Sequence, residues 1–142
     1  MARLNAYLKF NDDKCREAME FYKDCLGGGE LTLQTVGETP MKDQMPPETH
    51  SKIMHATFKK GELEFFASDM MRDKAVVGDS VILALNCDSE EELKTIFAKL
   101  SVGGDVFMAP EKQFWGGVFG DVTDKYGNEW MLNYQEGEWK LS

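Results

Sequence analysis

Apolar and polar side chains alternate along two stretches of the chain, and apolar residues at helical spacing follow each stretch. The alternation in residues 3–10 and 80–87 predicts two half-buried strands. The helical spacing predicts one helix capped by Asp12 or Asp13 and another capped by Ser89, because these side chains accept hydrogen bonds from the first backbone N–H groups of a helix. Glycines at 27–29 and 103–104 predict where the helices end.

Three further strand patterns follow each predicted helix, so the order strand, helix, strand, strand, strand occurs twice, at a period of about 75 residues. We interpret residues 1–69 and 78–136 as two copies of one module. One helix leaves a sheet face of each module uncovered, so we expect the pair to complete a single domain, residues 1–142. The predicted class is α+β, with mixed sheets and the helices on the outer faces. The additional strands are predicted at residues 30–36, 52–58, 62–68, 105–108, 117–123 and 128–134.

The segment 37–50 separates two predicted strands and contains three of the four prolines. A loop of this length is long enough to form a lid or one wall of a binding site.

The net charge narrows the range of partners. The 16 Lys and Arg residues face 25 Asp and Glu residues, a formal charge of −9. This acidity argues against nucleic acid as a partner, because phosphate binding requires a basic surface.

Three cysteines without paired spacing argue against a secreted disulfide scaffold. The N-terminal residues contain no long apolar run, so we expect neither a signal peptide nor a membrane partner, and we expect a cytoplasmic protein.

Four segments resemble a known family: FYKDCLGG (21–28), IMHATF (53–58), FFASD (65–69) and FWGGVFGDVTDKYGNEWMLN (114–133). The first is similar to the opening of the vicinal-oxygen-chelate (VOC) superfamily, which includes the glyoxalase I and bleomycin-resistance folds. The others resemble its PhnB-like branch, whose members are often labelled 3-demethylubiquinone-9 3-methyltransferase-like. The resemblance covers nearly the whole chain and implies two βαβββ modules that form a cupped sheet.

Metal enzymes of this superfamily bind a divalent ion through the first and last strand of each module. By strand register, the resemblance carries these four ligand positions onto Asn5, Phe66, Ile82 and Met131. Three of the four side chains are apolar, whereas divalent transition metals need imidazole, carboxylate or thiolate donors. We therefore predict no metal and no other cofactor.

An alternative ligand set remains open. Glu64 and Glu129 are each one pleat from a family ligand position and on the same face, and His55 is a further donor. Most such carboxylates are solvated side chains on a strand face, so this set is the fallback and not the main prediction.

His55 alternates with Ile53 and Thr57, and we expect it to point into the cup. It is either a polar anchor or general base, as its near-neutral titration allows, or a hydrogen-bonded strand histidine without chemistry. Aromatic and apolar neighbours complete the predicted ligand pocket, for which the candidates are Asn5, Tyr7, His55, Phe66, Ile82, Trp115, Phe119 and Met131.

The cysteines have two possible roles. Cys25 and Cys87 lie on apolar faces and are expected to pack as small hydrophobic residues. Cys15 is close to the start of a predicted helix, where a thiolate is stabilised, but no histidine is paired with it in the sequence, so nucleophilic catalysis is disfavoured.

Three functions remain, and the catalytic residues are unknown for all of them. The first is binding of a small organic molecule in the cup without the family metal. The second is a metal-dependent lyase, isomerase or dioxygenase of the superfamily. A methyltransferase comes third, because no G-x-G-x-x-G segment follows a predicted strand.

Open sheet edges in a chain of this size lead us to expect a homodimer.

Overall fold

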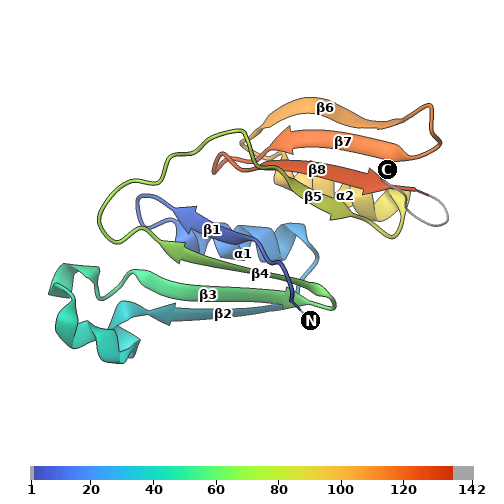
Figure 1. The fold of residues 1–142 in the computed structure, drawn as a ribbon. Coiled ribbons are helices and arrows are strands. Elements are labelled where there is room, and N and C mark those ends of the chain that lie inside the picture. The colour runs from blue at the N-terminus through green and yellow to red at the C-terminus, as the bar shows by residue number, and fades with distance from the viewer. Residues whose placement is uncertain (1, 136–142) are drawn as a thin grey trace. The chain divides into compact units, whose positions relative to one another are not determined.

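The computed structural model describes residues 2–135. The chain divides into two compact units, Met1–Val76 and Val77–Ser142. In unit 1 the sheet order is β1-β4-β3-β2, with β1 parallel to β4 and the other pairs antiparallel (Figure 1). The elements of unit 1 are β1 (Tyr7–Phe10), α1 (Cys15–Cys25), β2 (Glu30–Thr35), β3 (Ile53–Lys60) and β4 (Leu63–Asp69).

Unit 2 repeats this arrangement with the sheet order β5-β8-β7-β6, in which only β5 and β8 are parallel. The predicted order of two βαβββ modules, each with a mixed four-stranded sheet, is therefore confirmed. The elements of unit 2 are β5 (Leu83–Asn86), α2 (Glu90–Leu100), β6 (Asp105–Lys112), β7 (Val118–Thr123) and β8 (Glu129–Tyr134).

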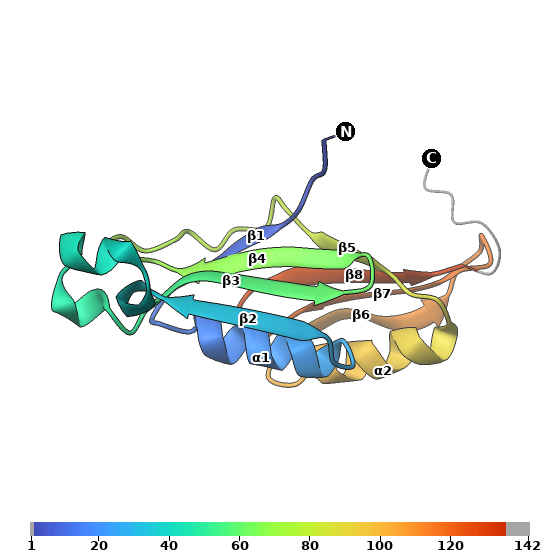
Figure 2. The same ribbon diagram turned by 90° about the horizontal axis from the view of Figure 1, so that it is seen from below.

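Each helix covers one face of its own sheet (Figure 2). Tyr22 of α1 is fully buried, and its ring centroid lies 6.2 Å from that of Phe65 and 6.3 Å from that of Phe10. In unit 2 a Cβ added to Gly120 would lie 2.8 Å from the ring of Phe97, so this glycine lets α2 approach the sheet closely. The apolar cores of the two units are built on these faces.

The start of α1 differs from the prediction. Asp12 and Asp13 both have φ of 57°, and neither caps the helix. The carboxylate of Asp69 accepts hydrogen bonds instead from the backbone N–H groups of Cys15 (2.9 Å) and Ile53 (2.8 Å). The cap is thus supplied by the end of β4, which local spacing along the sequence does not reveal.

The start of α2 agrees with the prediction. Ser89 Oγ accepts a hydrogen bond from the backbone N–H of Glu92 at 3.0 Å. The Glu92 side chain reaches back to the N–H of Asp88 at 2.9 Å, which satisfies a second backbone donor.

Two strands begin later than predicted. β1 begins at Tyr7 and not at Arg3, because the Asn5 side chain takes the place of a backbone donor and bonds to the carbonyl of Glu64 at 2.9 Å. β5 begins at Leu83 and not at Ser80, because its register with β8 covers only four residues. The two family ligand positions Asn5 and Ile82 therefore precede their strands.

The strand β6 is longer than the predicted 105–108 and extends to Lys112. Two register shifts, after Val106 and after Met108, let the strand continue past Pro110 as an edge strand.

Three short 3-10 helices occupy the predicted loop 37–50: Val36–Glu38, Pro40–Gln44 and Pro47–Thr49. His50 Nε2 lies 2.8 Å from the carbonyl of Lys42 and 3.1 Å from that of Met45, which ties the segment together. Among the described residues, no helix has the length and apolar character required to cross a membrane.

Candidate functional site

The sheet of unit 1 has a face turned away from α1. Along β3 and β4, Ala56, Phe58, Phe65 and Ala67 are buried on the helix side. Because side chains alternate along a strand, their neighbours point to the opposite face. The register places Phe66 of β4 directly between Tyr7 of β1 and Thr57 of β3 on that face, in agreement with the predicted alternation.

Three rings meet on this face, each from a different strand, and we call Tyr7, His55 and Phe66 the aromatic cluster. Their centroids are 6.0 Å apart for Tyr7 and His55, 6.3 Å for Tyr7 and Phe66, and 5.6 Å for His55 and Phe66. Tyr7 is 45 % exposed, and the other two are partly buried. Offset and tilted rings at these distances attract one another beyond the burial of their area.

Polar groups border the aromatic cluster. The hydroxyl of Thr57 lies 3.2 Å from His55 Nε2, and Lys9 Nζ lies 5.2 Å from the centroid of the Tyr7 ring. His55 is therefore hydrogen-bonded on its strand, which both predicted interpretations allow. A role as polar anchor is compatible with this geometry and remains a prediction.

The corresponding face of unit 2 carries Met131 and Phe119. Met131 of β8 lies opposite Asp121 of β7 and opposite Ala84 of β5, and Phe119 lies opposite Asn133. Each of these side chains is on the face opposite to buried Trp130, Leu132 and Val122, which pack with α2. The sheet face therefore combines apolar groups with a carboxylate and an amide.

A pair of carboxyl groups lies on this face of unit 2. Asp121 is only 7 % exposed, and Glu129 is a diagonal neighbour on β8. A hydrogen bond to Asp121, followed by partial burial and by the charges of Asp121 and Asp79, raises the pKa of Glu129 above its ordinary value of 4.5. Two carboxyl groups in contact share a proton more readily than they both ionise.

Sequence analysis did not single out Asp121. A signal was present, since an aspartate stands inside the otherwise apolar run Val118–Val122 of a predicted strand. A charged residue at a buried strand position is uncommon and calls for a specific partner.

The predicted pocket residue Trp115 lies outside both sheet faces, in the loop between β6 and β7. It is 44 % exposed, and its ring centroid lies 5.2 Å from that of Phe114, which is 98 % exposed. Participation of Trp115 in a pocket, like that of Ile82, remains a prediction.

The four family ligand positions do not offer the chemistry of a divalent metal site. The Asn5 amide nitrogen is engaged with the carbonyl of Glu64, and Phe66, Ile82 and Met131 contribute no imidazole, carboxylate or thiolate. Within residues 2–135, no group of three His, Cys, Asp or Glu side chains is arranged to hold a metal. Of the fallback ligands, Glu64 lies 3.9 Å from Arg3, and Glu129 is a diagonal neighbour of Asp121 on the sheet.

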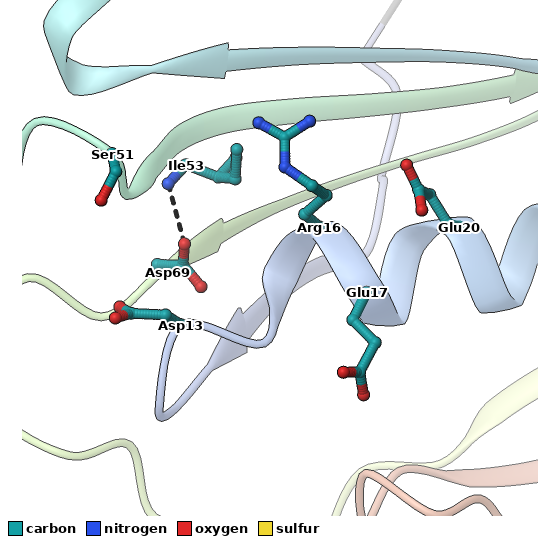
Figure 3. A pocket seen from close by; sticks show the side chains of 7 residues that line it. All are labelled: Asp13, Arg16, Glu17, Glu20, Ser51, Ile53 and Asp69. Atoms are coloured by element: carbon teal, nitrogen blue, oxygen red, sulfur yellow. Dashed lines mark hydrogen bonds between the residues drawn. The ribbon is translucent and has the colours of Figure 1, made fainter.

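A pocket of about 310 Å³ lies at the start of α1 in unit 1 (Figure 3). Asp69 forms part of its wall, but both oxygens of this carboxylate are already engaged with backbone N–H groups. Three of the six remaining lining side chains are acidic and one is an arginine, and sequence analysis did not identify them as a site. They are Asp13, Arg16, Glu17, Glu20, Ser51 and Ile53.

The three cysteines are buried and free. Burial, and then the charge of Asp69, raises the pKa of Cys15 to about 12. The expectation that the helix start would stabilise a Cys15 thiolate is therefore wrong, because desolvation and a nearby carboxylate outweigh the helix dipole. Burial also raises the pKa of Cys87 to about 12, in agreement with its predicted role as a packing residue.

The model of one protein family, described as 3-demethylubiquinone-9 3-methyltransferase, matches residues 2–133. The chain belongs to this family. Protein YjdN of Escherichia coli (strain K12) is 31 % identical over 138 residues, which cover 92 % of this chain and 93 % of that protein. The resemblance to the PhnB-like branch is thereby confirmed at the level of the family.

Solved structures support the same assignment. Protein PA1353 from Pseudomonas aeruginosa is 32 % identical, with a TM-score of 0.78 over 94 % of this chain and 98 % of that one. A PhnB protein from Bacillus cereus is 26 % identical, with a TM-score of 0.75 over 94 % and 99 % of the two chains. A glyoxalase/bleomycin resistance protein/dioxygenase family enzyme from Burkholderia phytofirmans PsJN, at 12 % identity and a TM-score of 0.57 over 91 % of this chain and 96 % of that one, shares the fold.

The family description names a methyl transfer, but the described residues lack the usual framework for it. Such enzymes commonly bind their cofactor at a glycine-rich turn between a strand and a helix of a parallel sheet. In this family member, Gly27, Gly28 and Gly29 follow a helix, and all three have positive φ values typical of a helix stop. The sheet faces are therefore better candidates for a ligand-binding site than this glycine-rich loop.

Proposed function

We propose that this protein binds a small planar aromatic molecule against the aromatic cluster of unit 1, without the metal used by glyoxalase-like relatives. The observation that carries the proposal is the meeting of Tyr7, His55 and Phe66, from three strands, on the sheet face away from α1.

The cluster has the properties of a binding surface and not of a closed core. A ring 45 % exposed at Tyr7, next to two partly buried rings, leaves aromatic surface on which a further ring can stack. Side chains packed only for stability in this unit lie on the other face, around Tyr22 and Phe58, where they are fully buried.

Polar groups at the edge of the cluster can orient a bound ligand. Thr57 and His55 offer hydrogen-bonding atoms, and the ammonium group of Lys9 stands beside the Tyr7 ring. A mainly apolar surface with a few polar groups is the usual composition of a small-molecule site. The ligand that fits best is an aromatic ring with a hydroxyl group. Phe119 and Met131 give unit 2 a second apolar surface that is suited to the same class of molecule.

The test uses 2-naphthol as a probe and follows its binding by ¹H–¹⁵N NMR. We expect saturable shifts at Tyr7, His55 and Phe66, and an affinity reduced at least tenfold in Tyr7→Ala. Phe114→Ala is the matched control, because it removes a ring that is 98 % exposed in another part of the chain. Thermal unfolding of both variants separates lost binding from lost folding.

Two results would contradict the proposal. The first is binding of 2-naphthol that Tyr7→Ala leaves unchanged. The second is stoichiometric Ni, Zn, Mn or Fe in the purified protein or after its addition, which would favour the alternative of a metal-dependent lyase, isomerase or dioxygenase. A methyltransferase remains the third candidate, and transfer of a methyl group to a hydroxyl of the ligand would establish it.

A further inference from the structure

The most unusual polar group in the described chain is the buried carboxyl of Asp121. The residue is only 7 % exposed, and its Oδ1 atom is buried without a hydrogen-bond partner. An unpartnered carboxylate oxygen in this environment costs free energy, because it has lost its water without gaining a donor.

Its surroundings on the sheet are acidic. Asp121 lies opposite Met131, and Glu129 is its diagonal neighbour toward the start of β8. The charge of Asp79, in the segment before β5, also acts on Glu129. Ala84 of β5, which lies opposite Met131, carries no charge, and neither does Ile82 just before this strand.

No positive side chain offsets this charge among residues 2–135. Neither Asp121 nor Glu129 takes part in an ion pair with a residue that the structure describes. Carboxyl groups buried in proteins are normally paired with a cation or with several N–H donors. Here the two carboxyl groups act on each other instead, and their interaction raises the pKa of Glu129.

We propose that Asp121 and Glu129 form a recognition site for an amidinium or ammonium group of a small organic ligand. Such a group brings N–H donors that reach both carboxyls, including the unpartnered Oδ1 of Asp121, and its positive charge offsets their negative charge. This site lies wholly in unit 2 and does not depend on the aromatic cluster.

The neighbours of the pair favour an organic cation with an apolar body. Met131 lies across from Asp121, and its flexible side chain can move aside for a ligand and then pack on it. Phe119, two residues before Asp121 on the same face, adds a ring for cation–π or aromatic contact. Asn133, with its buried and unpartnered amide nitrogen, borders the site on the other side of Met131.

Binding of a cation at this pair has a defined pH dependence. Glu129 must be ionised before both carboxylates can face the cation, so binding below the pKa of Glu129 releases a proton. The affinity should therefore rise with pH until Glu129 is ionised, and then level off. The groups that set this titration are Asp121 from β7 and Asp79 from the segment before β5.

The experiment measures binding of benzamidinium by calorimetry and NMR, with neutral benzamide of the same shape as the charge control. We expect benzamidinium to bind at least tenfold more tightly than benzamide, and to shift the resonances of Asp121, Glu129 and Met131. Calorimetry in two buffers of different ionisation enthalpy should show proton release below the pKa of Glu129. Asp121→Asn and Glu129→Gln should each reduce the affinity at least tenfold.

The control substitution is Glu91→Gln, which removes an exposed carboxylate from α2, on the helix side of the sheet, and should leave the affinity unchanged. Glu129 is only partly buried, so its variant remains informative if Asp121→Asn does not fold. Three outcomes would overturn the proposal: no binding of benzamidinium beyond that of benzamide, binding that neither variant weakens, or stoichiometric binding of Mg²⁺ or Mn²⁺ that both variants abolish.

Discussion

Asp69 and Cys15 are separated by 54 positions in the sequence, yet the Asp69 carboxylate accepts a 2.9 Å hydrogen bond from the backbone N–H of Cys15. The other oxygen of this carboxylate accepts from the N–H of Ile53 at 2.8 Å. A single side chain at the end of β4 thus joins the start of α1 to the start of β3. Figure 3 shows its hydrogen bond to Ile53. It serves the structure of unit 1 and not a ligand.

Replacing this side chain should destabilise the protein. Asp69→Ala leaves two buried N–H groups without an acceptor, and we expect a loss of about 3 kcal/mol in the free energy of unfolding. Urea denaturation followed by circular dichroism measures it. The control is Asp13→Asn, which removes the exposed Asp13–Lys52 ion pair but tolerates the positive φ, and should cost less than about 1 kcal/mol. Equal losses in the two variants would contradict the assigned role of Asp69.

The two glycines that follow α2 have different roles, which substitution should separate. Gly103 has φ of 75° and ends the helix, whereas a Cβ added to Gly104 would lie 2.2 Å from the carbonyl oxygen of Thr123. Gly104→Ala must therefore displace backbone, and we expect it to cost about 3 kcal/mol of stability. Gly78→Ala, whose Cβ meets nothing within 4 Å, should change stability by no more than about 0.5 kcal/mol. Thermal unfolding of both variants is the measurement, and a stable Gly104→Ala protein would contradict the assigned close approach.

Elements with strong local signals could be predicted from the sequence. The capping box at Ser89 and the strand alternation around Phe66 depend on neighbouring residues, and the structure bears them out. Alternation along each strand also predicts that Tyr7, His55 and Phe66 share one sheet face, in agreement with the strand register. Hydrophobic periodicity therefore predicts both the two modules and the sheet face on which the aromatic cluster lies.

Features that depend on contacts between distant segments could not be predicted. The capping role of Asp69, the Asn5 side chain that replaces a backbone donor, and the buried carboxyl pair of Asp121 and Glu129 all arise from strand pairing across long stretches of sequence. The helix and strand propensities of neighbouring residues do not indicate such long-range pairings. The high pKa of Cys15 was missed for the same reason, since its burial and the approach of Asp69 arise only in the fold.

The cysteines should be unreactive in the folded protein. Cys15, Cys25 and Cys87 are 0 %, 1 % and 8 % exposed, and the pKa of both Cys15 and Cys87 is raised to about 12. Reaction with a thiol reagent at pH 8 should therefore modify the cysteines only as fast as the protein unfolds, with all three reacting in denaturant. Rapid modification of Cys15 in the native protein would revive the disfavoured idea of a nucleophile at this position.

The expected homodimer also has a direct test. Strand β6 is an unpaired sheet edge within unit 2, with Val106 and Phe107 exposed by 50 % and 80 %. Exposed apolar side chains on an edge strand favour association with another chain. Analytical ultracentrifugation at tens of micromolar should show a dimer, and Phe107→Asp should shift the equilibrium toward monomer if β6 contributes to the interface. A monomeric wild-type protein at this concentration would contradict the prediction.

The carboxyl pair also affects stability in a way that depends on pH. The pKa of Glu129 is raised in the folded protein, chiefly by its hydrogen bond to Asp121, above an ordinary value of 4.5. Between these two values the folded state binds more protons than the unfolded state, so the contribution of Glu129 to stability falls as pH rises through this interval and is constant outside it.

Glu129→Gln keeps a hydrogen-bond donor toward Asp121 but does not titrate. Relative to this variant, the wild-type protein should therefore lose stability as pH rises from 4.5 and reach a constant difference once Glu129 is ionised. Urea denaturation across the pH range measures the difference, with Glu111→Gln as the control for loss of one exposed carboxylate. A wild-type protein that gains stability over the same interval, relative to Glu129→Gln, would show that the two carboxyls do not share a proton.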